Sequence, residues 1–150
     1  MATTASSGKP AWQDTLEASG LLVIGMETPG PLPAVLTAIH AVTGVEVTPD
    51  ATVPESHPDA AAELDRQWQA RTSKLPLMSD NREFLILPPG QGGSSVGWVL
   101  VRDDSESGLP SRVAAATGSP EFLALSADGR HLCAVSTEED EYWIVARTFA

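Results

Sequence analysis

The sequence predicts an α+β fold in which helices pack on a largely antiparallel sheet. The second half of the chain holds short apolar segments separated by turn residues, and the first half holds two segments with apolar residues at helical spacing. A chain of 150 residues can also bury one self-sufficient core. We therefore expect one α+β domain over residues 16–150, with two or three helices on one face of the sheet.

The sequence of the N-terminal third predicts a disordered arm, which is followed by a β-α-β segment. Residues 1–15 are small and polar without periodicity, so we expect them to be disordered. The aliphatic run at residues 21–24 predicts a buried strand, and apolar residues recur at helical spacing over residues 32–42. Residues 45–48 predict a second, short strand.

A second helix is expected after a loop with three prolines, residues 49–58. Ser56 and Asp59 suit the start of a helix that runs to about Thr72. The apolar stripe of this helix is thin. We therefore expect it to lie at the edge of the fold, anchored mainly by Trp68.

The second half predicts two three-stranded meanders with the same order of features, over residues 75–102 and 121–147. The expected strands are residues 77–79, 84–87 and 98–102 in the first stretch and residues 123–126, 132–135 and 143–147 in the second. Asp80 and Asp128 each open a turn after the first strand of their stretch. Two interpretations stay open, an internal duplication or two ordinary hairpin arrangements that share common turn residues. Between the stretches, residues 110–117 suit a short helix, although a strand also fits there.

The acidic charge excludes several kinds of partner, and the single cysteine indicates the cellular compartment. The chain has 9 basic and 20 acidic residues, a net charge of −11. Because nucleic acids and anionic membranes need clustered Lys and Arg, we expect neither as a partner. A single cysteine, Cys133, permits no intrachain disulfide, and no signal-peptide core is recognisable, so we expect a cytoplasmic protein. The bias toward Ala, Gly, Pro and Arg indicates a GC-rich bacterial genome.

His131 and Cys133 are the candidates for catalysis. They are two residues apart on an expected strand, so both side chains point to one face. A thiol beside an imidazole can serve as nucleophile and base, or as part of a metal site. However, the sequence supplies no orienting third group, and a free cysteine between apolar neighbours is most often buried. We expect no cofactor and no metal, and we keep a small enzyme or ligand-binding domain that uses this pair as the alternative function.

Two loops resemble ligand-binding loops only in part. Residues 103–108 match the first half of a calcium loop, but Ala114 stands where the bidentate glutamate is required. The glycine-rich residues 89–95 are followed by an expected strand and not by the helix that a phosphate loop needs. Both are expected to be ordinary solvated loops.

Acidic residues beside aromatic ones are the candidates for partner binding. The densest acidic run is expected at the tip of a hairpin, next to Tyr142 and Trp143. The candidate residues are Glu138, Glu139, Asp140, Glu141 and Tyr142 of this hairpin, together with Asp103, Asp104 and Glu106 of an earlier loop. Carboxylates speed the encounter with a cationic protein and aromatic side chains anchor it. A solvated tip with a core-facing Trp143 is the alternative interpretation.

These observations predict a non-catalytic, acidic protein-binding module with a basic protein partner. One form of this function is an inhibitor or immunity protein that masks a cationic toxin or nuclease, because an acidic surface can imitate the charge of that enzyme's substrate. Four of the nine basic residues form a positive strip, Arg66, Arg71, Lys74 and Arg82. This strip leaves self-association into a homo-oligomer open.

Overall fold

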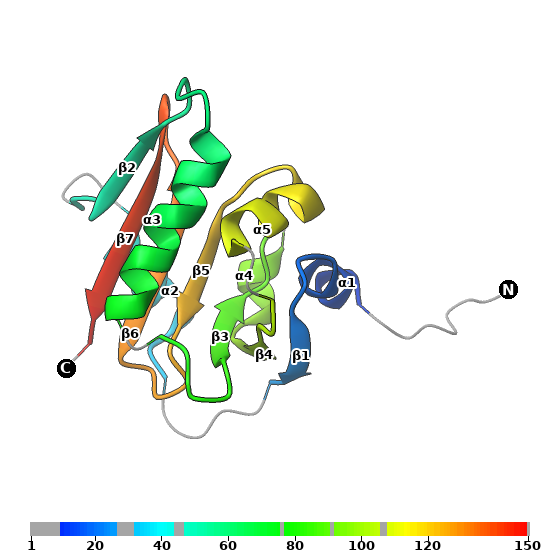
Figure 1. Cartoon of the computed structure of the whole chain (residues 1–150). Coiled ribbons are helices and arrows are strands. Elements are labelled where there is room, and N and C mark those ends of the chain that lie inside the picture. Colours follow the sequence, from blue (N-terminus) through cyan, green and yellow to red (C-terminus); the bar gives the residue numbers. More distant parts are fainter. Residues whose placement is uncertain are drawn as a thin grey trace, which may run out of the picture.

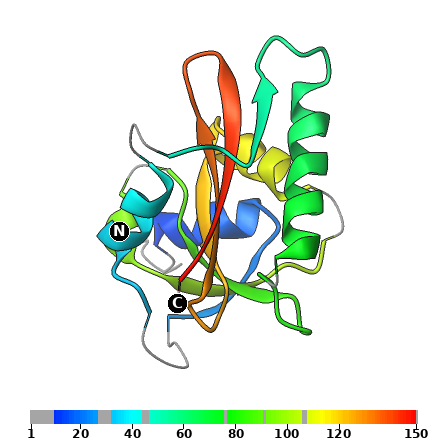
Figure 2. The ribbon, with the colours of Figure 1, turned by 90° about the vertical axis from the view of Figure 1, so that its left-hand side faces the viewer.

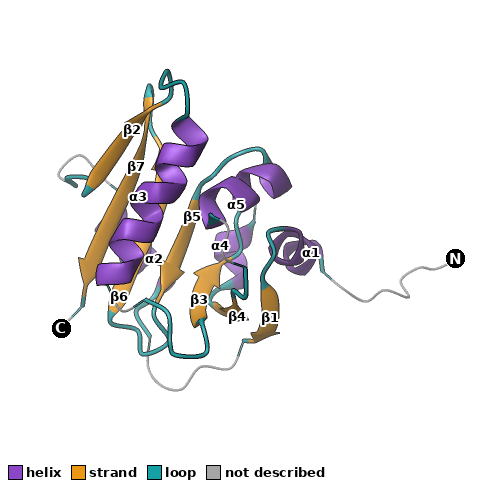
Figure 3. Cartoon of the chain, in the orientation of Figure 1, coloured by secondary structure: helices purple, strands orange, loops and turns teal. Residues whose placement is uncertain are grey.

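A computed structural model of the chain shows helices on both faces of one seven-stranded antiparallel sheet (Figures 1 and 3). It describes residues 10–26, 32–43, 47–75, 77–90, 92–105 and 108–149. The strands are β1 (Leu22–Gly25), β2 (Ala51–Pro54), β3 (Glu83–Leu87), β4 (Val99–Arg102), β5 (Phe122–Leu125), β6 (His131–Thr137) and β7 (Glu141–Thr148). The helices are α1 (Ala11–Ala18), α2 (Val35–Val42), α3 (Ala60–Lys74), α4 (Gly93–Val96) and α5 (Leu109–Thr117). Across the sheet the strand order is β1-β4-β3-β5-β6-β7-β2, which confirms the predicted α+β class.

The central strands need cover on both faces. All four residues of β5 are buried, as are the last four residues of β3, so apolar side chains project from both sides of the sheet. Helices α1, α3 and α5 cover one side, which we call the helix-rich face, and α2 covers the other, which we call the α2 face. Figure 2 shows α3 and α2 on opposite sides of the sheet. Three of the longer helices therefore share one face, as predicted, and α2 lies opposite them; the single helical turn α4 also packs on the helix-rich face through Val96.

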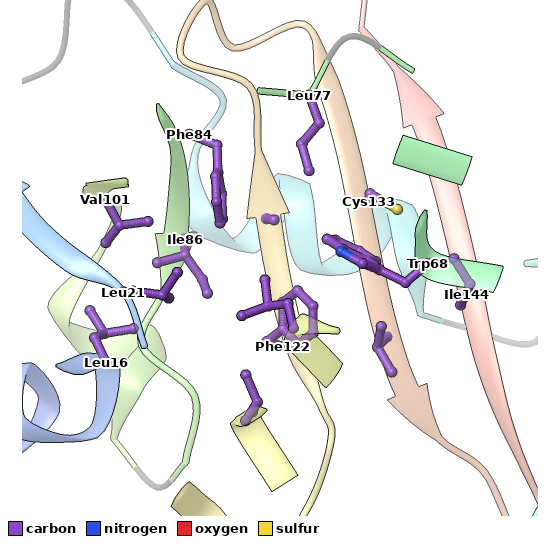
Figure 4. Close-up of a cluster of buried hydrophobic side chains, with 14 of the residues drawn as sticks. Leu16, Leu21, Trp68, Leu77, Phe84, Ile86, Val101, Phe122, Cys133 and Ile144 are labelled. Carbon is purple, nitrogen blue, oxygen red and sulfur yellow. The ribbon is translucent and has the colours of Figure 1, made fainter. Parts of the chain in front are cut away.

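Trp68 anchors α3 on the helix-rich face, as predicted. Its side chain is 2% exposed and meets the ring of Phe122 edge-on, with the ring centroids 4.8 Å apart (Figure 4). Cys133 of β6 and Ile144 of β7 also belong to this core. A long helix with few apolar residues is thus held mainly by one large aromatic side chain.

Asp65 joins α3 to α5. Its two carboxylate oxygens accept hydrogen bonds from the backbone N–H of Ser111, at 3.0 Å, and from the Ser111 hydroxyl, at 2.5 Å. Ser111 lies in the first turn of α5, and the N-cap residue Gly108 has no side chain with which to cap it. A Cβ atom at Gly108 would lie 2.1 Å from the Asp65 carboxyl carbon, so the close approach requires glycine. A side chain of one helix therefore caps the next helix.

The N-terminal strands differ from the predicted β-α-β segment. Of the strand expected at residues 45–48, residues 45 and 46 lie outside the described residues and the other two are not in a strand; β2 begins at Ala51 instead. Asp50 explains this position, because its backbone N–H donates to the carbonyl of Ile144 and its carboxylate accepts from the N–H of Ala146. β1 and β2 then form opposite edges of the sheet.

The arm predicted for residues 1–15 is wrong for residues 11–15, which belong to α1, while residues 1–9 lie outside the described residues. Leu16 is the buried residue of this helix, and Trp12 packs against the core. Trp12 and Leu16 lie four residues apart, which is helical spacing, but two apolar residues are too few for a sequence pattern to indicate a helix.

The second meander is confirmed, whereas the first lacks its first strand. β5, β6 and β7 pair consecutively. Residues 77–79 form no strand, because β3 pairs with β4 on one edge and with β5 on the other. The two turns are nevertheless alike, since the hydroxyls of Ser79 and Ser126 accept hydrogen bonds from the backbone N–H groups of Glu83 and His131. The internal duplication stays a prediction.

The connections on either side of β4 both contain helices. α5 confirms the helix predicted at residues 110–117. The glycine-rich residues 89–95, expected to lead directly into a strand, instead run into the single helical turn α4. A Cβ atom at Gly93 would lie 1.6 Å from the carbonyl oxygen of Pro88, so a glycine is required where this turn begins.

We predict that Asp65→Ala lowers the free energy of unfolding by about 1–3 kcal/mol, because α5 loses its cap and the Ser111 hydroxyl loses its partner. Urea unfolding of the whole chain measures the change. Asp80→Ala is the matched control, since Asp80 is exposed in a turn, and it should change stability by less than about 0.5 kcal/mol. Equal effects of the two substitutions would contradict the role of Asp65.

Candidate protein-binding surface

The antiparallel register assigns each loop to one of two ends of the sheet. The β6–β7 turn, the start of β5 and the end of β2 lie together at one end, which we call the hairpin end (Figure 1). α3 also begins there, because a chain of backbone hydrogen bonds leads from Pro54 through His57 to Ala60. The β5–β6 turn, the start of β3 and the end of β4 lie at the far end.

Exposed carboxylates gather at the hairpin end. They are Glu55, Glu121, Glu138, Glu139 and Asp140. Backbone contacts fix three of them in place: the N–H of Glu55 donates to the carbonyl of Asp140 at 2.9 Å, and the carboxylate of Glu121 accepts from the N–H of Thr137 at 2.8 Å. None of the five forms an ion pair within the described part of the chain. Two of them, Glu55 and Glu121, were not predicted, because each is a lone acidic residue far from the run in sequence.

Glu141 and Tyr142 are more enclosed than the turn itself. The Glu141 carboxylate accepts a hydrogen bond of 2.5 Å from the indole N–H of Trp143, and both side chains are half-buried. Tyr142 lies on the helix-rich face at a cavity of about 60 Å³, next to Leu64 and Pro110. Trp143 packs on the α2 face, as the core-facing alternative expects.

The second acidic segment does not join this surface. Asp103 is 3% exposed, and its carboxylate lies 2.8 Å from the Arg112 guanidinium and accepts the backbone N–H of Ser105. It therefore stabilises the fold and is closed to a partner. Asp104 is exposed but follows β4 at the far end, and Glu106 lies outside the described residues. The acidic residues predicted as one binding set are thus split between the two ends of the sheet.

The cationic side chains of the described residues lie mostly away from the hairpin end. At the far end are Arg82, Arg102, Arg130 and Arg147, and the last turn of α3 carries Arg71 and Lys74. Arg66, nearer the start of α3, pairs with Glu63 at 2.5 Å. The predicted positive strip therefore extends along α3 toward the far end. The cations of that end lie among carboxylates, since Arg102 pairs with Glu83 and Arg147 with Asp50, whereas the carboxylates of the hairpin end have no such cations beside them within the described residues.

Cys133 lies in the core and not in a site. Its side chain is fully buried, and burial raises the pKa of the thiol from its ordinary value of 9.0 to about 12, with the nearby Asp50 carboxylate adding to the rise. His131 is half-exposed at the start of β6, and its ring nitrogen lies 3.4 Å from the Thr148 hydroxyl. The thiol is therefore protonated at neutral pH and closed to solvent, which counts against the nucleophile of the alternative function.

The described residues contain no group of three or more His, Cys, Asp or Glu side chains that could hold a metal ion. Within the same residues, no helix has the length and apolar character needed to span a membrane.

The protein is therefore an open antiparallel sheet that helices cover on both faces, with exposed carboxylates concentrated at one end of the strands. No protein-family model matches the chain, and searches of curated proteins and of solved structures find no match either.

We predict that Cys133 in the folded protein reacts with a thiol reagent at least about a hundredfold more slowly than in the unfolded chain, because the thiol is both buried and protonated. Labelling with a chromogenic disulfide between pH 7 and pH 9.0, with and without urea, measures the two rates. Rapid labelling of the folded protein would restore His131 and Cys133 as a candidate catalytic pair.

Proposed function

We propose that this chain is a non-catalytic protein-binding module whose hairpin end binds a basic protein. One observation carries the proposal: five exposed carboxylates from β2, β5 and the β6–β7 turn converge at this end, without a cation of the described chain to pair with them. The net charge of −11 acts in the same direction.

Crowded carboxylates do not help this end of the fold. Like charges within about a Debye length, roughly 8 Å at physiological ionic strength, repel one another and lower the stability of the compact state. A cationic surface that docks on them removes this repulsion and adds attraction, so bound protein is more stable than free protein. The cluster is therefore easier to explain as a binding surface than as a contribution to folding.

The backbone around the cluster is held in one shape before any partner arrives. The N–H of Glu138 donates to the carbonyl of Glu141 at 2.8 Å, which closes the β6–β7 turn, and Glu55 is tied to Asp140. A surface that is already ordered loses little conformational entropy on binding. This supports a specific protein partner over loose attraction to any cation.

An inhibitor or immunity protein of the bacterial cytoplasm is the form of this function that we favour. A cationic toxin or nuclease presents a basic surface that normally holds a polyanion, and an array of carboxylates can occupy that surface in its place. The proposal requires no catalytic group in this chain.

Self-association is a second candidate, favoured by the arginines that gather at the far end while the carboxylates of the hairpin end stay unpaired among the described residues. The carboxylates of the hairpin end could meet the arginines of the far end of another copy, which is a head-to-tail contact. Sedimentation at low and high salt distinguishes the two candidates, because only self-association raises the mass of the purified chain alone.

The acidic turn is tested by Glu139→Gln/Asp140→Asn, which removes two charges at little change of shape. We expect this variant to bind a basic partner about three- to tenfold more weakly, since each exposed charge pair contributes about 0.2–1 kcal/mol. The wild-type chain, immobilised, captures the partner from a lysate of its native cell at low salt, and calorimetry with the purified partner gives the affinities.

Asp80→Asn/Asp104→Asn is the matched control, because it removes the same charge at the far end and should leave the affinity unchanged. If both double variants weaken binding equally, the loss of affinity comes from the change in net charge and not from the position of the carboxylates. Binding that does not weaken with salt, or the absence of any basic partner, would contradict the proposed function.

A further inference from the structure

A pocket of about 350 Å³ opens on the α2 face immediately beside the acidic cluster. It lies between the last turn of α2, the end of β3, the start of β5 and the end of β6. The buried side chains of Val42, Leu87, Leu123 and Ala134, one from each element, form its apolar base. Its position follows from the register, because the start of β5 and the end of β6 are also the strand ends that carry the carboxylates.

Polar groups occur only at the margin of the pocket. Thr43 and Glu121 are exposed and Ser136 is half-buried, and these are its polar side chains among the described residues. Glu121 is the charged one, and the Ser136 hydroxyl donates to the carboxylate of Glu138 at 3.0 Å. The margin is therefore negative and the base is apolar.

The apolar base and the negative margin together determine which kind of ligand the pocket favours. An anionic ligand would be repelled by Glu121 and Glu138, and a polar metabolite would find few converging groups to orient it. An apolar side chain would be favoured by the base, and a Lys or Arg next to it in sequence would meet the carboxylates at the margin. Such a side chain, buried at the centre of an interface and surrounded by charged pairs, has the position of a binding hot spot.

We propose that this pocket binds one large apolar side chain of the basic partner, carried on a segment with Lys or Arg on either side. The inference rests on the proposed function and adds the anchor to it: the carboxylates attract the partner and the pocket fixes its register. Volume agrees with this, because about 350 Å³ accommodates a leucine or phenylalanine side chain with room for the adjoining backbone.

The probe for this inference is a fluorescent peptide with a central phenylalanine between two pairs of lysines, compared with the same peptide carrying glycine at the centre. Fluorescence anisotropy at low salt measures both affinities for the whole chain. We expect the phenylalanine peptide to bind about tenfold or more tightly than the glycine peptide, which is the gain from burying one aromatic side chain.

Ser136→Leu fills the pocket from the end of β6 and should reduce this ratio of affinities to about one. Thr43→Leu fills it from the end of α2 and serves as the second variant if the first does not fold. Thr148→Leu is the matched control, since Thr148 is an exposed strand residue near the far end, and it should leave the ratio unchanged.

The outcomes separate the two proposals. If both peptides bind equally, with an affinity that falls as salt rises, the acidic surface stands and the pocket is not an anchor. If the ratio is high but survives both pocket-filling variants, the phenylalanine binds elsewhere and the inference is wrong. If neither peptide binds at low salt, the proposed function fails together with the inference.

Discussion

The burial of both faces of β3 and β5 is the constraint on which the rest of this structure depends. Strands that are apolar on both sides cannot lie at the surface, so the chain must supply helices above and below them. Three helices meet this need on one face. On the other face α2, with eight residues, covers the centre of the sheet but not its whole area.

The incomplete cover of the α2 face has visible effects at two places. Leu22 and Ile24 of the edge strand β1 remain 51% and 44% exposed. At the hairpin end of the central strands, the end of α2 leaves the pocket open above Leu123 and Ala134. The same short helix therefore accounts for the exposed apolar edge and for the concave site beside the carboxylates.

Local sequence signals predicted the parts of the fold that depend on neighbouring residues. The β5-β6-β7 meander, the start of α5 and the anchoring of α3 by Trp68 follow from turn dipeptides and apolar spacing. The errors concern pairing between distant segments. Residues 77–79 resemble a strand, but β5 takes their place beside β3, and nothing in either segment alone records that preference. β2 was misplaced for a similar reason, because its position depends on Asp50 binding to a strand almost a hundred residues later.

The candidate site, like the fold, was predictable only where neighbouring residues in the sequence define it. The acidic turn was visible in the sequence as a run of like charges, and the structure keeps it exposed. The role of Asp103 was not visible, because its burial depends on Arg112 from the following helix. The pocket could not have been predicted either, since its base combines single apolar residues from four elements, each of which reads as ordinary core.

The unpaired carboxylates at the hairpin end make the distribution of charge along the strands uneven, because the acidic residues of the far end lie among arginines. For a basic partner of the kind proposed, this uneven charge would favour approach to the hairpin end before contact. A neutral molecule of the same shape would have to find this orientation by rotational diffusion alone. The antiparallel register, which brings these strand ends together, would then set the orientation of approach as well as the shape of the proposed binding surface.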